Sequence, residues 1–264
     1  MDGKMTFKRI TIAFAVSVFS VYALLIISLF YFYEWPLFMK TLLSERTLFS
    51  IRLSLMAATI ATVVSLFFAI PSAYALSRYQ FPGRQVIDTL LELPIIVSPV
   101  ALGAMILIFF TTPAGQLIQE RGTSLVFTIY GILLAQFITT VGIAIRFIKA
   151  VFDEIPKKHE EAAWVLGLAP AQTFFKVMLP LGKKGIIASA VLTWAKALGE
   201  FGATITIAGS MAMKTETLPI AIFMRLSSAD IEGTAVLVLI LLGIGLGLLY
   251  GARLFADRDW IYRV

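Results

Sequence analysis

Lys196 and Glu200 are the residues whose types and spacing most readily suggest chemistry, because they stand inside a long apolar stretch, residues 185–209. They lie four positions apart, which puts both side chains on one face of a helix. An ionised side chain is costly in an apolar environment unless it has a partner. The spacing therefore indicates either a mutually neutralising pair that fixes helix packing or a pair along the path of a solute, and both readings stay open.

A metal site or a catalytic group is the next possibility, and the sequence argues against both. His159 is the one histidine and stands beside Glu160 and Glu161, but no second histidine, cysteine or aspartate lies at ligand spacing,. The chain contains no cysteine, which excludes thiolate ligands and cysteine nucleophiles,. It also lacks the glycine-rich phosphate-binding loop of ATPases. We therefore expect a chain that is not an enzyme and that binds no metal and no cofactor of its own.

The composition defines the surroundings of these residues. Hydrophobic residues make up 59% of the chain and charged residues 14%, and the mean hydropathy is +0.91. A soluble domain carries roughly a quarter charged residues, so this chain has too little polar surface for water. The net charge of +6 could suggest nucleic acid, but the basic residues stand between apolar runs, where membrane topology places them,. We therefore expect a protein embedded in lipid, with no nucleic-acid partner.

Six runs are long and apolar enough to span a bilayer, which takes about 20 mostly apolar residues. The sequence thus predicts an all-α integral membrane protein with one transmembrane domain over residues 1–264. Its helices should lie near 10–33, 53–77, 90–112, 123–148, 185–209 and 232–254. The first run is longer than the apolar core of a signal peptide, about 7–15 residues, so we expect it to be retained.

The distribution of lysine and arginine predicts the orientation. With six spans, 15 of the 22 basic residues fall on the side of both termini and of the loop 150–184, and six fall on the other side. Basic residues accumulate on the cytoplasmic side of a membrane. We therefore expect a multi-pass protein of the cell membrane with both termini and the loop 150–184 in the cytoplasm.

The loop 150–184 contains the signals of two short helices. Glu160 and Glu161, followed by two alanines, favour a first helix,. Gly167 is suited to end it, and Pro170 to begin a second helix that should stop before Pro180. The apolar side chains of this loop either pack on the ends of the spans or form a surface for a partner. The loop thus predicts two helices that face the cytoplasm.

Four elements of this loop, Glu161-Ala162-Ala163, Gly167 and Val177-Met178-Leu179-Pro180, resemble the EAA motif in residue type and spacing. That motif marks the membrane subunits of ABC importers, and Val177 in place of isoleucine is the one departure. The resemblance implies a type I importer permease fold of the MetI-like kind, with coupling helices that dock on separate ATP-binding subunits. ATP and magnesium would be bound by those subunits. The implied docking residues are Glu160, Glu161, Ala162, Ala163, Gly167, Leu168 and Pro170.

A second resemblance concerns the cargo. The segment Gly199–Ile205, which reads GEFGATI, is similar to permeases for tetrahedral oxyanions, and in this form to molybdate permeases. The segments 215–223 and 92–99 resemble the same group. The resemblance implies a homodimer that forms the path for molybdate, with sulfate and tungstate as alternatives, and an extracytoplasmic oxyanion-binding protein as a partner. An ion channel or a membrane enzyme is the rival class, but no filter or catalytic cluster is evident.

For several other residues the sequence allows two roles. Pro94 and Pro99 interrupt the third run and, with Lys196 and Glu200, could shape the translocation path or simply kink and pack helices,. Glycines at four-residue spacing in the last run allow close helix approach, within one chain or between copies. Arg225 and Asp230 could meet the binding protein or could be solvated charges. The glycines at four-residue spacing in the last run are Gly243, Gly247 and Gly251.

Overall fold

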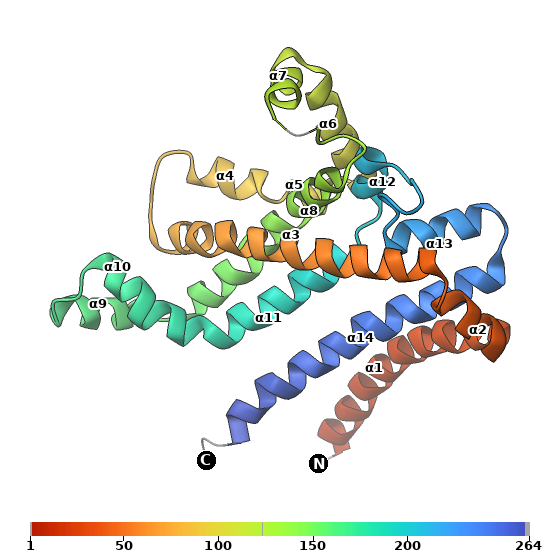
Figure 1. The fold of residues 1–264 in the computed structure, drawn as a ribbon. Coiled ribbons are helices and arrows are strands. Elements are labelled where there is room, and N and C mark those ends of the chain that lie inside the picture. Colours follow the sequence, from red (N-terminus) through yellow and green to blue (C-terminus); the bar gives the residue numbers. More distant parts are fainter. Residues whose placement is uncertain (1, 123, 262–264) are drawn as a thin grey trace.

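The computed structural model describes residues 2–122 and 124–261, and every regular element among them is a helix (Figure 1). The first half contains α1 (Asp2–Leu29), the 3-10 turn η1 (Phe30–Phe32), α2 (Trp35–Leu42), α3 (Glu45–Arg78), α4 (Arg84–Leu90), α5 (Leu93–Ile96), α6 (Pro99–Thr111) and α7 (Pro113–Arg121). The second half contains α8 (Ile129–Glu154), α9 (Lys158–Val165), α10 (Pro170–Thr173), the π-helical turn η2 (Phe174–Met178), α11 (Leu179–Leu198), α12 (Gly202–Ala208), α13 (Leu218–Ser227) and α14 (Ile231–Ile261). The all-α fold class is confirmed.

Helices α3 and α8 form the centre of the bundle, with α11 packed against both. The face that α3 buries consists largely of small side chains, which allow helix axes to approach closely where lipid gives no hydrophobic driving force. A hydrogen bond of 3.0 Å between the hydroxyls of Ser65 and Thr140 joins α3 to α8 in the interior. The buried alanines of α3 are Ala57, Ala58, Ala61, Ala69 and Ala73.

Fewer helices are long and apolar enough to span a bilayer than the sequence predicts. Among the described residues, four helical stretches are long and apolar enough to span a bilayer: residues 7–32, 45–78, 129–154 and 231–251. A fifth exists if the pair 84–96 and 99–111, bent by 115°, counts as one crossing. The expected total of six is therefore not confirmed.

The run 185–209 is not one continuous helix. Helix α11 ends at Leu198, and α12 begins only at Gly202. The carboxylate of Glu200 accepts a hydrogen bond of 3.1 Å from the backbone N–H of Ala203, which satisfies a donor that the first turn of α12 would otherwise leave unpaired,. A glutamate that lies in the break and caps the next helix therefore interrupts a segment whose apolar composition suggests a single span.

The second helix of the loop 150–184 does not stop before Pro180, which corrects the expectation from sequence. Elements α10, η2 and α11 follow one another without a gap from Pro170 to Leu198. In η2 the N–H of Leu179 donates to the carbonyl of Phe174, five residues earlier. A π-turn widens the helix by one residue, and this one ends two residues before Pro180, which would otherwise break a regular helix,. The chain thus enters α11 directly from the loop.

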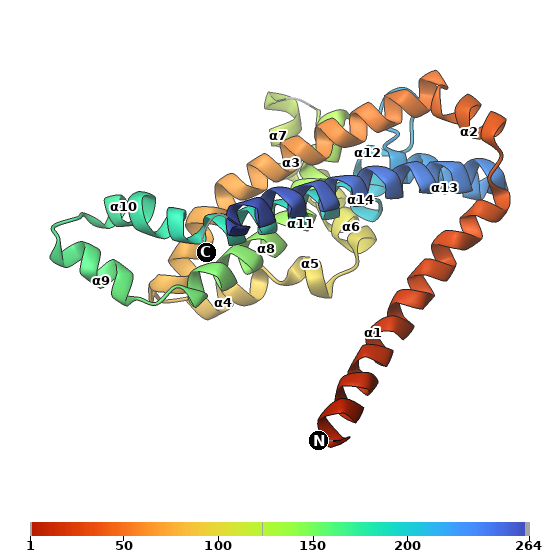
Figure 2. The same ribbon diagram turned by 90° about the horizontal axis from the view of Figure 1, so that it is seen from below.

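The bundle has two ends, defined here by the helices that lie there. Figure 1 shows α9 and α10 at one end, called the α9 end, and α2 and α13 at the opposite end, called the α13 end. Helix α3 runs between them. Figure 2 shows α1 standing apart from the other helices, and none of the described side chains of α1 is fully buried. Most of the surface of α1 is therefore free to meet lipid or another chain.

Candidate functional site

The turn after α9 has the backbone conformation that the sequence predicts. Gly167 adopts a positive φ of 83° directly after α9. Its N–H donates to the carbonyl of Trp164 at 2.9 Å, and the N–H of Leu168 donates to the carbonyl of Ala163 at 3.0 Å. This pair of hydrogen bonds is the Schellman arrangement that closes a helix C-terminus. Pro170 then opens α10, so the two short helices meet where the sequence places them.

The surface of this turn is apolar and exposed. The side chains of Val165 and Leu166 are 88% and 82% exposed, far more than residues of their type usually are in a folded chain,. Trp164 is about half exposed. Of the expected docking residues, Glu161, Ala162, Gly167 and Pro170 are exposed, and Leu168 is half-buried.

The apolar side chains of the loop divide between two environments. Met178 is fully buried, and the ring of Phe174 packs at 4.8 Å from the ring of Tyr74 in α3. Phe175, by contrast, is exposed. Part of the loop thus packs on the ends of the long helices, as one reading of the sequence has it, while the tip at residues 164–166 presents an uncovered apolar surface.

Glu160 and Ala163 differ from the other expected docking residues because both are buried. The carboxylate of Glu160 forms an ion pair with Arg78 at the end of α3, and both side chains are almost completely buried. It also accepts a hydrogen bond of 3.2 Å from the hydroxyl of Tyr74. Arg78 further donates to the carbonyl of Ile155 at 2.7 Å. Glu160 therefore holds α9 against α3 and presents no free carboxylate at the surface.

Lys196 and Glu200 form the ion pair that their spacing predicts. The Nζ of Lys196 lies 2.9 Å from Oε2 of Glu200. The glutamate side chain is buried, whereas the lysine side chain is 39% exposed. Because Glu200 also caps α12 through Ala203, the pair fixes the break between α11 and α12. The pair thus lies at the break between the two helices, and the lysine keeps a partly open face.

The break in α11–α12 meets the bend at the start of α6. A Cβ added to Gly202 would lie 2.9 Å from the backbone nitrogen of Val100 and 3.0 Å from Cβ of Pro99. A Cβ added to Gly103 would lie 2.9 Å from Cα of Ala203. Only glycine permits these approaches, so two interrupted helices touch at their interruptions. Pro99 and the Lys196–Glu200 pair, which are far apart in sequence, therefore belong to one region.

Pro94 lies on the other side of the bend, against α8. A Cβ added to Gly142 of α8 would lie 2.2 Å from the carbonyl oxygen of Leu91 and 3.5 Å from Cδ of Pro94. A cavity of about 430 Å³ opens between α5, α6 and α8. Its lining is apolar and includes Leu93, Pro94, Phe109, Leu134 and Val141. The side chains of this lining offer an anion neither a charge nor a hydrogen-bond donor,.

At the α13 end, an ion pair that sequence reasoning missed joins α3 to the segment before α13. The guanidinium of Arg46 donates two hydrogen bonds to the carboxylate of Glu216, at 2.7 and 2.5 Å. Glu216 is completely buried, while the arginine side chain is 55% exposed. Glu216 stands between Thr215 and Thr217 in a polar segment, so the sequence gives no sign that its side chain is inside.

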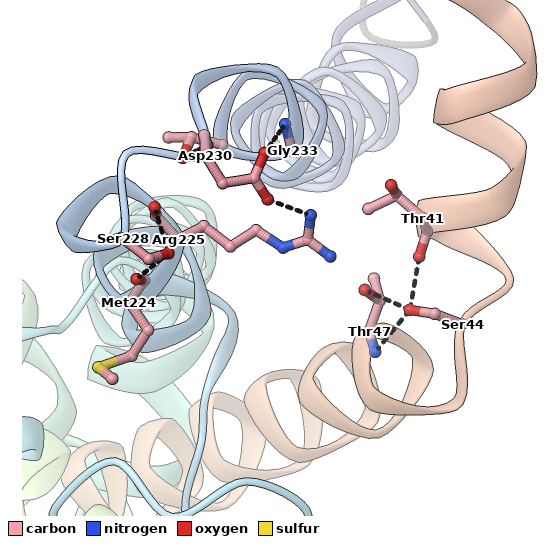
Figure 3. Close-up of polar contacts among 9 residues, drawn as sticks. Thr41, Ser44, Thr47, Met224, Arg225, Ser228, Asp230 and Gly233 are labelled. Carbon is pink, nitrogen blue, oxygen red and sulfur yellow. Dashed lines mark hydrogen bonds and ion pairs between the residues drawn. The ribbon is translucent and has the colours of Figure 1, made fainter.

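Arg225 and Asp230 bind each other and the start of α14 (Figure 3). The guanidinium of Arg225 donates to Oδ2 of Asp230 at 2.9 Å, and Oδ1 accepts from the N–H of Gly233 at 2.9 Å. Figure 3 shows Arg225 reaching from α13 toward the cap of α3, where Ser44 contacts Thr47. These two charges are therefore engaged in capping and in closing the turn between α13 and α14.

The glycines of α14 and His159 are the remaining residues for which the sequence left two interpretations. A Cβ added to Gly243, Gly247 or Gly251 meets nothing within 4 Å among the described residues, so this glycine stripe of α14 makes no close helix contact within the described part of the chain. His159 is exposed, and the described residues contain no cluster of three metal-ligating side chains.

The sequence of the chain matches a family model over residues 62–258, and the family is described as the binding-protein-dependent transport system inner membrane component. The sulfate transport system permease protein CysT of Salmonella typhimurium is 30% identical over 85% of this chain and 82% of its own length. The probable molybdenum ABC transporter permease protein of Haloferax volcanii is 34% identical over 97% of this chain and 93% of its own.

Solved structures of ABC transporters share the fold. A chain of the bacterial alginate ABC transporter, in complex with its alginate pentasaccharide-bound periplasmic protein, superimposes with a TM-score of 0.75 over 96% of both chains, at 16% identity. A chain of the MetNI methionine transporter in an inward-facing conformation gives a TM-score of 0.62, also at 16% identity, over 82% of this chain and 99% of its own. At that identity the similarity concerns the fold alone.

Proposed function

This chain belongs to the family of inner membrane components of binding-protein-dependent transport systems, and on that premise we propose that it is the permease subunit of an ABC importer for a tetrahedral oxyanion. The observation that carries the proposal is the tip of the loop after α9. Val165 and Leu166 stand almost fully exposed on a turn that two hydrogen bonds close. An exposed apolar patch on a rigid turn indicates a partner surface.

The partner at this tip is a separate ATP-binding subunit, which carries ATP and magnesium, while this chain catalyses no reaction. Glu161, Ala162, Gly167 and Pro170 form the exposed contact surface together with the apolar tip, and Leu168 lies at its margin. Glu160 and Ala163 hold the helix from behind. The α9 end and both termini face the cytoplasm in this proposal, and the distribution of basic residues supports that orientation.

The cargo we propose is molybdate. The segment GEFGATI at residues 199–205 and the relative named for molybdenum support it. Sulfate is the second candidate, because relatives of similar identity are named for sulfate. Both anions are tetrahedral, so a path that passes one has the shape to pass the other.

The path runs between two copies of the chain, beside the place where the break at Gly202 meets the bend at Pro99. Interrupted helices are a recurrent feature of transporter pathways, since backbone outside a helix needs protein or water around it. A binding protein on the α13 side delivers the anion. ATP binding and hydrolysis then favour different conformations in turn, which gives alternating access.

The proposal is tested by co-expressing the chain with an ATP-binding subunit and a binding protein encoded beside it, and by reconstituting the complex in liposomes. We expect the ATP-binding subunit to co-purify, and ATP to drive uptake of labelled molybdate that excess sulfate reduces only weakly. Co-purification without molybdate uptake but with sulfate uptake would overturn the cargo. A chain that recovers no ATP-binding subunit would overturn the importer itself.

A further inference from the structure

Helix α3 is the longest helix of the described chain and connects its two ends. Its 34 residues correspond to about 51 Å at the rise of an α-helix,. The helix continues through Pro71 without a gap, and Figures 1 and 2 both show it reaching from the α13 end toward the α9 end. Near each of its ends, an arginine of α3 binds a buried glutamate from a segment remote in sequence.

At the α9 end, the contact is with the loop helix. Arg78 binds Glu160, 82 positions later, and Tyr74, one turn earlier in α3, donates to the same carboxylate. Both charged side chains are almost completely buried. Separating a buried ion pair leaves each charge without compensation. A displacement of α9 therefore has to carry the end of α3 with it.

At the α13 end, the contact is with the segment between α12 and α13. Arg46 binds Glu216, 170 positions later, through two parallel hydrogen bonds. The hydroxyl of Ser54, further along α3, accepts a hydrogen bond of 2.7 Å from the N–H of Leu218. A cation in the first turn of a helix opposes the helix dipole, so the position of Arg46 does not serve the stability of α3 itself. The favourable interaction of Arg46 is therefore its contact with the carboxylate of Glu216.

Between these contacts, α3 lies against α8 on a face of small side chains. Alanine and serine side chains interdigitate less deeply than leucine or phenylalanine. Small sliding movements of packed helices are a known form of conformational change. An interface of this kind is compatible with a shift of α3 against α8 as one body.

We propose that α3 is the strut that couples the loop helix α9 to the segment 209–217 at the opposite end, with Glu160 and Glu216 as its two attachment points. The proposal rests on the proposed function, since the ATP-binding subunit would supply the force at α9. Arg78, Glu160, Arg46 and Glu216 are positioning residues that touch neither nucleotide nor cargo. The alternative is that the two ion pairs only stabilise a static fold.

A measurement at the α13 end, remote from α9, separates these alternatives. Because the chain contains no cysteine, a single introduced cysteine can report on that end. Thr217 is buried beside Glu216, and its hydroxyl has no hydrogen-bond partner in the described part of the chain. A Thr217→Cys substitution removes one methyl group, keeps a side chain of similar size and places a single thiol at the far attachment point. Its rate of modification by a membrane-impermeant maleimide then reports movement of this segment in the complex reconstituted with the ATP-binding subunit.

We expect ATP to change the modification rate of Thr217→Cys by about fivefold or more, the range of ordinary coupling between sites. Adding Glu160→Gln, at the other end of α3, should bring the ratio of the rates with and without ATP close to one while the ATP-binding subunit stays bound. Arg78→Lys, which keeps the charge, should retain part of the response. Glu154→Gln removes an exposed carboxylate at the same end and should leave the response unchanged.

A full ATP response in the Glu160→Gln background would overturn the strut. If that variant fails to assemble, Tyr74→Phe removes one hydrogen bond to Glu160 and should weaken the response; an undiminished response there would overturn the strut equally. Failure of the proposed function looks different. In that case the ATP-binding subunit does not co-purify with the unsubstituted chain. If the subunit does co-purify but ATP leaves the Thr217→Cys rate unchanged, the strut is overturned while the proposed function stands.

Discussion

The two ends of α3 carry the same kind of ion pair in different surroundings. Arg78 and Glu160 at the α9 end are both buried, whereas at the α13 end Glu216 is buried but Arg46 is more than half exposed. The α9 end also presents a closed turn with an apolar tip, while the α13 end is fixed by helix caps around Ser44 and Asp230. The difference indicates that the ion pair at the α9 end depends more strongly on its partner than the pair at the α13 end, where water reaches the guanidinium,.

The largest expected effect is at the α9 end. Arg78→Leu leaves the carboxylate of Glu160 buried without a partner, and we expect a loss of about 3–5 kcal/mol in the free energy of unfolding,. Unfolding in detergent, followed by intrinsic fluorescence, measures it. The double variant Arg78→Leu/Glu160→Leu should recover most of the loss, because the unpaired charge is gone. A loss below about 1 kcal/mol in the single variant would contradict the burial of the pair.

The corresponding change at the α13 end should cost less. Arg46→Leu leaves Glu216 without its guanidinium, and we expect a loss of about 2 kcal/mol, since Arg46 opens to solvent and water can replace part of the contact,. Glu216→Gln should cost less still, because the remaining charge is the exposed one. The same unfolding measurement applies to both variants. Equal losses for Arg46→Leu and Arg78→Leu would remove the contrast between the two ends.

Substitutions of Gly167 should act through the backbone conformation of the turn and not through steric contacts of the new side chain. A Cβ there would meet nothing within 4 Å, but φ is 83°. Gly167→Val should therefore lower the free energy of unfolding by about 1–2 kcal/mol and reduce co-purification of the ATP-binding subunit. Asparagine tolerates this backbone conformation, so Gly167→Asn should keep both the stability and the co-purification of the unsubstituted chain. If both variants bind the subunit like the unsubstituted chain, the turn has no docking role.

The smallest expected effect concerns the cap of α14. Asp230→Ala removes the acceptor for the N–H of Gly233 and the partner of Arg225, and we expect a loss of about 1 kcal/mol with uptake per complex unchanged,. Asp230→Asn, which can still cap the helix, is the matched control. Uptake that fails while stability is kept would give this pair a role in receiving the binding protein.

Sequence reasoning succeeded where the determinants are local. The turn at Gly167 depends on residues within a few positions, so the glycine and Pro170 were sufficient to place two short helices. The Lys196–Glu200 pair likewise follows from helical spacing. The all-α membrane class follows from composition, because no other surroundings accommodate so few charges.

The rest depends on contacts that spacing does not reveal. The partners of Arg78 and Arg46 lie 82 and 170 positions away. From the sequence alone, both arginines count only toward the distribution of basic residues that predicts the orientation. The break before Gly202 is hidden because Glu200, its cap, looks like a charge within a span. The helix through Pro180 is hidden because a π-turn, not a helix end, accommodates the proline. In each case tertiary packing selects one of several locally allowed conformations.

The most direct test of the account is whether the apolar tip of the loop contacts an ATP-binding subunit. A single cysteine at Val165, in a chain that otherwise has none, can be treated with a short thiol-to-amine cross-linker in membranes that contain the complete complex. We expect a cross-linked product containing the ATP-binding subunit, with a yield that falls sharply in the Gly167→Val background. A Val165→Cys thiol that reacts freely with aqueous maleimide in the assembled complex, and yields no such product, would contradict it.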